Sequence, residues 1–314
     1  GRDRLLFSAD LGASDGADHH SGNGVVHHCR LYDELCGLLG SPSDQRRCIP
    51  ELWCYPGSGS LSYALGAAIF GMVVSRWGFR PGNVALWVLW ILMCVVALSL
   101  PNPPPASHLD QKPVTLLQGF RTLRSNRVYW VMLAALFLCT LASGSMESFY
   151  SVLILSAGGT EQHVGFALFL QATSELPVMF GYSRLRSRLH LSAAPLMAVS
   201  MLCYALKALT LASAGSLNII LVAALFQALS FALFTPACVD FMLETVPGEY
   251  LAMGHLLFLA IGQGIGAVAG NALSGILSEY LGMAWMFRTV GFLALLASVL
   301  ACCSAKMLKR RNFS

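Results

Sequence analysis

Two charged residues lie within apolar stretches of this sequence, where their chemistry suits proton transfer or the binding of a polar solute. Glu175 lies in the apolar run 163–182, two residues before Pro177, and Lys207 lies in the run 192–212. A charge at the centre of a bilayer costs at least about 2.5–3.5 kcal/mol on insertion scales, so each one needs a reason. An acid and a base at similar depth in neighbouring helices suit a water-filled path. We therefore predict a functional role for both, with a structural salt bridge as the alternative.

Two more polar residues extend this candidate cavity. Glu147 lies toward the outer part of the run 128–155, and Gln227 lies in the run 216–240. A carboxylate and an amide at these positions are able to bind a polar solute. The alternative for Gln227 is a hydrogen bond that holds two helices together. Asp240 falls near the inner end of its run, where we expect an ordinary interfacial charge.

The motifs of common catalysts and ATP-driven pumps are absent from the sequence. It contains no Gly-rich loop with a Walker lysine, no His-Glu-x-x-His and no Gly-x-Ser-x-Gly. The histidines and cysteines before residue 56 match no compact zinc-binding pattern. We therefore expect no enzyme, no bound metal and no cofactor.

The elements that position these residues are apolar runs of transmembrane length. The chain has 314 residues, of which 56% are hydrophobic and 11% charged, with a mean hydropathy of +0.63. Soluble domains carry about 25% charged residues, so an ordinary soluble enzyme is excluded. An apolar run of about 20 residues crosses the bilayer as a helix. We predict an all-α membrane protein with about eight transmembrane helices, at residues 60–76, 84–100, 128–155, 163–182, 192–212, 216–240, 251–276 and 284–305.

Basic residues are distributed unevenly between the two sets of loops. Arg76 and Arg80 lie on one side, and eleven basic residues lie on the other. By the positive-inside rule, the second side is cytoplasmic and holds both termini of a protein of the inner or plasma membrane. The basic residues do not share one face, so no nucleic-acid partner is expected. The sequence does not define an oligomeric state. The eleven are Lys112, Arg121, Arg124, Arg127, Arg184, Arg186, Arg188, Lys306, Lys309, Arg310 and Arg311.

Glycines at a spacing of four residues mark one helix face in the run 251–276. Gly262, Gly266 and Gly270 leave that face without side chains, so a second helix can approach closely. We predict helix packing here, with a flexing of the helix during transport as the alternative.

Five segments follow one another in order along the chain. They are Gly59-Ser-Leu-Ser-Tyr-Ala-Leu-Gly66, Leu116-Leu-Gln-Gly-Phe-Arg121 with Tyr129-Trp130, Glu175-Leu-Pro177, Tyr204-Ala-Leu-Lys207 and Phe226-Gln-Ala-Leu-Ser-Phe-Ala-Leu-Phe234. In this order they resemble the major facilitator superfamily, in the branch of lactose permease and the phenylpropionate-permease-like symporters. The resemblance covers about 57–306. It implies that Glu175 corresponds to a glutamate linked to proton coupling and Lys207 to an arginine of the ninth helix. Gln227 and Ser230 stand where the sugar permease has a histidine and a glutamate, which departs from a lactose-type coupling.

The resemblance assigns the eight runs to helices five to twelve of a twelve-helix fold, so helices one to four are missing. Residues 1–56, which have no sustained period, would then be disordered or read out of frame in a truncated gene. A genuine soluble N-terminal segment is the alternative. The implied organisation is a two-helix remnant of the N-terminal bundle (57–100), a cytoplasmic linker with an interfacial amphipathic helix (101–127), a complete six-helix C-terminal bundle (128–306) and a basic tail (307–314).

The expected function is secondary active transport of a small organic solute, with proton symport by alternating access between two helix bundles. A proton-antiport efflux carrier and a non-transporting structural or assembly protein of the membrane are the alternatives.

Overall fold

Helices dominate the computed structural model, which describes residues 54–99, 116–189 and 191–312. The described helices all belong to one unit, residues 51–314. The predictions for residues 1–53 and for the linker up to residue 115 lie outside the described ranges. No strand occurs in the described ranges, which confirms the predicted all-α class.

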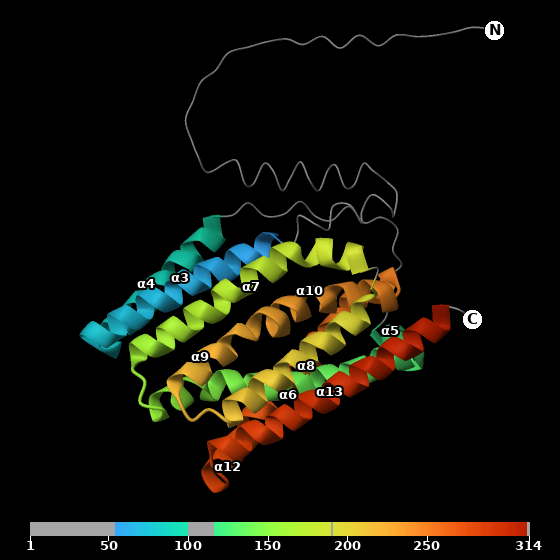
Figure 1. Ribbon diagram of the computed structural model, residues 1–314. Helices are drawn as coiled ribbons and strands as arrows, with labels where there is room; N and C mark the ends of the chain where they lie inside the picture. Colours follow the sequence, from blue (N-terminus) through green and yellow to red (C-terminus); the bar gives the residue numbers. More distant parts are fainter. Residues whose placement is uncertain (1–53, 100–115, 190, 313–314) are drawn as a thin grey trace, which may run out of the picture. The chain divides into compact units, whose positions relative to one another are not determined.

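The helices follow the predicted apolar runs in order (Figure 1). A helix also forms in the second part of the predicted linker. The bounds are α3 (Cys54–Trp77), α4 (Phe79–Ser99), α5 (Leu116–Ser125), α6 (Arg127–Ser156), α7 (Glu161–Leu189), α8 (Ala193–Ala212), α9 (Leu217–Leu225), α10 (Gln227–Thr245), α11 (Leu251–Leu257), α12 (Gly266–Tyr280) and α13 (Met283–Asn312). A 3₁₀ turn, η1 (Gly248–Tyr250), precedes α11, and a π-helical segment, η2 (Phe258–Ile265), joins α11 to α12.

Seven helical segments of the described chain are long and apolar enough to cross a membrane. The eighth predicted span, 60–76, forms the 24-residue helix α3, which is not among these seven. The seven are Phe79–Ser99, Arg127–Ser156, Glu161–Arg188, Ala193–Ala212, Leu217–Thr245, Met253–Tyr280 and Met283–Arg311.

Small residues let α8 and α13 pack closely together. Ala198 and Ala205 of α8 are buried, as are Ala294 and Ala297 of α13. The hydroxyl of Ser298 donates a 2.8 Å hydrogen bond to the backbone oxygen of Ala198. Helix α13 also packs along α6, and α10 packs between α8 and α7. These contacts form the core that carries the polar residues described below.

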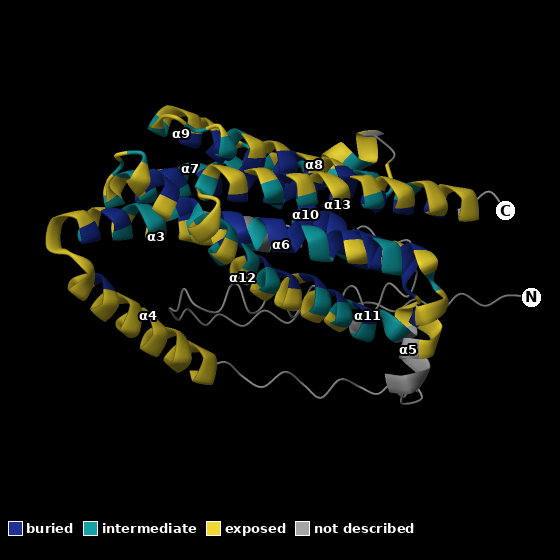
Figure 2. Ribbon diagram, turned by 90° about the horizontal axis from the view of Figure 1, so that it is seen from below, coloured by how far each residue is buried: buried dark blue, intermediate teal, exposed yellow. Residues whose placement is uncertain are grey.

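The pair α3 and α4 joins this core through α7. A Cβ built at Gly71 of α3 would lie 2.9 Å from Cα of Gly165 in α7, so the two backbones meet directly. Helix α4 packs mainly on α3, and Figure 2 shows it exposed along most of its length. Its exposed apolar residues, such as Trp87 and Leu98, form the kind of surface that lipid or another helix covers.

The predicted glycine face lies against α6. A Cβ added at Gly262 would overlap Leu136, and one added at Gly270 would overlap the backbone of Leu141. Gly262 itself lies in the π-helical segment η2. Its carbonyl oxygen accepts a hydrogen bond from the hydroxyl of Thr140. The glycines therefore bring backbone oxygens within reach of hydroxyl groups on α6.

Candidate functional site

Lys207 is the centre of the polar residues inside the helix bundle. Its Nζ donates a 2.6 Å hydrogen bond to Oε1 of Gln227, which joins α8 to α10. Both residues are buried, with 3% and 6% of their surface exposed. The ammonium group also lies 5.6 Å from the ring centroid of Tyr150 on α6, within the range of a cation–π interaction.

Two carboxylates lie within electrostatic range of this ammonium group. Glu175 on α7 is buried and Glu147 on α6 is exposed, and both act on the charge of Lys207. The structure thus brings together all four predicted cavity residues. Within the described chain, however, the hydrogen bond of Lys207 goes to Gln227 and to neither acid. Two acids and one ammonium group inside a helix bundle are able to bind a polar solute and to exchange protons.

Three residues near this group escaped the sequence analysis. Tyr63 on α3 is exposed and lies within electrostatic range of both Glu147 and Glu175. The hydroxyl of Tyr150 donates a 3.3 Å hydrogen bond to the backbone oxygen of Ile220, and the side chain of Gln171 lies close to this hydroxyl. Tyrosines in apolar runs resemble lipid-facing or core residues, so the sequence alone carried no signal for them.

The sixth predicted span is interrupted beside this site. Helix α9 ends at Leu225 and α10 begins at Gln227, with Phe226 between them. The amide of Phe226 bonds to the oxygen of Ala223, and the amide of Leu229 bonds to the oxygen of Phe226, both with the tighter spacing of three residues. The backbone of Phe226 stays in the right-handed helical region, so a single apolar span, Leu217–Thr245, continues across this tighter turn.

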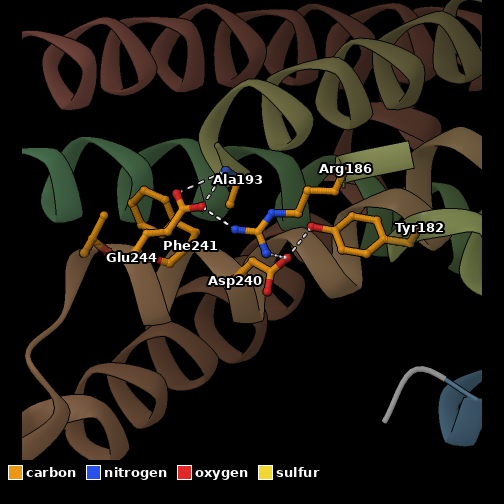
Figure 3. Close-up of polar contacts among 7 residues, drawn as sticks. Tyr182, Arg186, Ala193, Asp240, Phe241 and Glu244 are labelled. Atoms are coloured by element: carbon orange, nitrogen blue, oxygen red, sulfur yellow. Dashed lines mark hydrogen bonds and ion pairs between the residues drawn. The ribbon is translucent and has the colours of Figure 1, made fainter. Parts of the chain in front are cut away.

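A second polar cluster joins α7, α8 and α10 at the end of the bundle that we predict to be cytoplasmic (Figure 3). Arg186 lies between two carboxylates, with Nη1 2.6 Å from Oδ2 of Asp240 and Nη2 2.6 Å from Oε1 of Glu244. The hydroxyl of Tyr182 donates a 2.7 Å hydrogen bond to Asp240. The backbone amide of Ala193, at the start of α8, donates to both oxygens of Glu244.

The prediction that Asp240 is an ordinary interfacial charge is wrong. Asp240 is 2% exposed and is paired with Arg186 across the α7–α10 interface. The spacing of four residues between Tyr182 and Arg186, and again between Asp240 and Glu244, places each pair on one helix face. That matching spacing was the available signal in the sequence.

The residues described by the structure include no group of three or more histidine, cysteine, aspartate or glutamate side chains arranged to hold a metal ion. This observation does not test the prediction that the protein binds no metal and no cofactor.

Comparison with known proteins identifies the family. Residues 57–289 match the MFS_1 like family. The chain is 23% identical over 239 residues to the uncharacterized transporter YwbF of Bacillus subtilis, and this alignment covers 76% of the chain and 58% of the relative. It is 25% identical over 230 residues to a maltose permease of Geobacillus stearothermophilus, covering 72% of the chain and 58% of the relative. It is also 32% identical over 106 residues to the uncharacterized MFS-type transporter YybF of Bacillus subtilis, covering 34% of the chain and 26% of the relative.

The chain thus spans 58% of the length of the first two relatives. The seven apolar helices found among the described residues and the relatives agree on a protein that crosses the membrane several times. This multi-pass membrane protein belongs to the MFS_1 like family, within the major facilitator superfamily.

Proposed function

We propose that this chain forms part of a secondary active transporter that carries a small organic solute together with protons across the plasma membrane. The observation that carries the proposal is the buried Lys207, which lies among Gln227, Glu147 and Glu175 inside the bundle. The transporter and permease names of the relatives support the same class of function. Because the chain spans little more than half of these relatives, the proposal concerns the activity of the whole transport protein.

Charge balance supports a coupling role for Glu175. With both acids ionised, the group formed by Lys207, Glu147 and Glu175 carries a net charge of −1. One proton on Glu175 brings the group to neutrality, and a neutral group costs less to enclose away from water. A carrier of this kind would therefore close around its solute most readily in the protonated state.

The solute would lie against the open side of this group, beside Glu147 and Tyr63, which are both exposed. The backbones of Gly71 in α3 and Gly165 in α7 are in direct contact. Alternating access would require these two helices to separate.

Three assignments rest on the sequence resemblance alone: the lactose permease branch, the equivalence of the spans to helices five to twelve, and the truncation. One relative is named a maltose permease, so a disaccharide is a reasonable first solute to test.

Uptake into proteoliposomes tests the proposal. The purified chain is assayed under an inwardly directed proton gradient with radiolabelled maltose, other sugars, nucleosides and aromatic acids. We expect accumulation of one class, and we expect Glu175→Gln to lose accumulation while it retains exchange of labelled for unlabelled solute. Glu279→Gln is the matched control, because Glu279 is an exposed acid near the end of α12.

Three outcomes would change the proposal. Accumulation by the Glu175→Gln protein would refute the proton role of Glu175. Accumulation only under the opposite gradient would indicate an antiport efflux carrier. Absence of both uptake and exchange by a chain that still unfolds cooperatively would favour a structural or assembly protein.

A further inference from the structure

The hydroxyl of Ser230 on α10 is buried without a hydrogen-bond partner in the described structure. The residue is fully buried. Serines inside helices usually bond to a carbonyl one turn earlier, as the hydroxyl of Ser145 does to Leu141. Buried polar groups nearly always have a partner, so an unpaired one calls for a specific explanation such as an unseen water or ligand.

Two contacts fix the register of α8 against α10. Lys207 bonds to Gln227, and the ring of Tyr204 packs edge-on against Phe234 with centroids 6.2 Å apart. Ser230 follows Gln227 by three residues and precedes Phe234 by four, so it shares their side of the helix. It therefore lies between the two contacts, on the side of α10 that meets α8.

Lys207, which contacts α10 beside Ser230, has hydrogen-bonding capacity that the described residues do not use. The ammonium group of Lys207 has three N–H donors, and within the described residues only one donates, to Gln227. The ring of Tyr204, one turn before Lys207, is buried beside Phe234. The interruption of the helix at Phe226 begins one turn before Ser230.

We propose that Lys207 and Ser230 bind one oxygen atom between α8 and α10, which belongs to a water molecule or to a hydroxyl group of the solute. The oxygen accepts a hydrogen bond from Nζ of Lys207 and bonds to the hydroxyl of Ser230, and Tyr204 lies one turn before Lys207 on α8. A bound water would make this site independent of the proposed function. A solute hydroxyl would make it rest on the proposed function.

Substitution of Ser230 tests the proposal through the direction in which the melting temperature changes. Removal of a hydroxyl that has no partner raises or preserves the melting temperature, whereas removal of one that holds an oxygen lowers it. We expect Ser230→Ala to lower the melting temperature of the solute-free chain in detergent by about 2–4 °C. The matched control is Ser274→Ala, because Ser274, on α12, is the other buried hydroxyl without a partner among the described residues. An unchanged or raised melting temperature for Ser230→Ala, with and without solute, would overturn the proposal.

A double variant ties the effect to Lys207. In a Lys207→Met background, Ser230→Ala should no longer lower the melting temperature, because the oxygen has lost its cationic donor. An equal lowering in both backgrounds would contradict a shared oxygen. Maltose is the probe that separates the two sources of the bound oxygen. With a bound water, Ser230→Ala lowers the melting temperature without maltose. With a solute hydroxyl, it does so only when maltose is present.

Radiolytic hydroxyl-radical labelling tests the native chain and needs neither a variant nor transport. A buried tyrosine is labelled rapidly only when a water molecule is bound beside it. We expect labelling of Tyr204, with the exposed Tyr63 as positive control and the buried Tyr129, whose hydroxyl donates to Gly254, as negative control. If Tyr204 stays as unlabelled as Tyr129 in the solute-free chain, a bound water is excluded. A solute hydroxyl then remains, and it requires Ser230→Ala to lower the melting temperature only with maltose. If neither is seen, the proposal fails.

Discussion

Lys207 donates its hydrogen bond to the neutral side chain of Gln227, over 2.6 Å, although two carboxylates lie within electrostatic range. A neutral acceptor satisfies the ammonium group without a direct ion pair. Neither Glu147 nor Glu175 is therefore the hydrogen-bond acceptor of Lys207. A direct salt bridge between Lys207 and Glu175 was the alternative that the sequence left open.

Gln227→Leu should destabilise the bundle by about 1.5–3 kcal/mol, the usual range for a hydrogen bond to a charged group. The substitution leaves Lys207 buried without its acceptor. Thermal and denaturant unfolding of the purified chain would measure the change. Gln263→Leu is the control, since Gln263 is exposed in η2 and should change stability by less than about 0.5 kcal/mol. Equal stability of the two variants would mean that the Lys207–Gln227 bond contributes nothing.

Arg186→Ala should cost more, about 3 kcal/mol. It leaves Asp240 buried without its cation, and loss of one partner from a buried ion pair typically costs about 3–5 kcal/mol. The lower end applies because the Arg186 side chain is 31% exposed and solvent weakens the pairing. Arg188→Ala is the comparison, because Arg188 is an exposed arginine two residues further along α7. If both variants unfold at the same temperature, the cluster of Figure 3 is not a clamp between α7 and α10.

Helix positions were predictable from the sequence because apolar runs of transmembrane length must form helices in lipid. The run 163–182 became α7, and the run 192–212 became α8 with nearly the same ends. The interruption at Phe226 and the π-helical segment η2 were not predictable, since neither interrupts the apolar pattern. Both depend on how neighbouring helices pack against the backbone.

The candidate site was predictable where charge contradicted the apolar surroundings, as for Glu175 and Lys207. The partner of Lys207 was not predictable, because an acid and an amide were both within plausible reach. Tyr63 joins the site only through the packing of α3 on α7, which the sequence does not specify.

Gly270→Ala should destabilise the chain by about 1–3 kcal/mol, because a Cβ there would overlap the backbone of Leu141 and the helices would have to separate. The separation would also disturb the 3.0 Å hydrogen bond from Ser145 to the backbone oxygen of Gly270. Gly275→Ala, one turn further along α12, meets no atom within 4 Å and should stabilise the helix by about 0.5–1 kcal/mol. Opposite shifts in melting temperature are therefore expected, and destabilisation by both variants would show that the effect is not steric.

The predicted orientation places the α7–α8 turn in the cytoplasm and the α8–α9 turn outside. Single cysteines at Arg188 and Ala214 test it, in a background whose native cysteines are replaced by alanine or serine. Both positions lie at helix ends, where a cysteine should disturb packing little. An impermeant maleimide added to intact cells should label Ala214→Cys directly and label Arg188→Cys only after permeabilisation. The physical reason is the excess of arginine on the side of Arg188, since a translocated arginine loop is disfavoured. Labelling of Arg188→Cys in intact cells would reverse the topology, and it would place the Arg186–Asp240–Glu244 cluster on the outer surface.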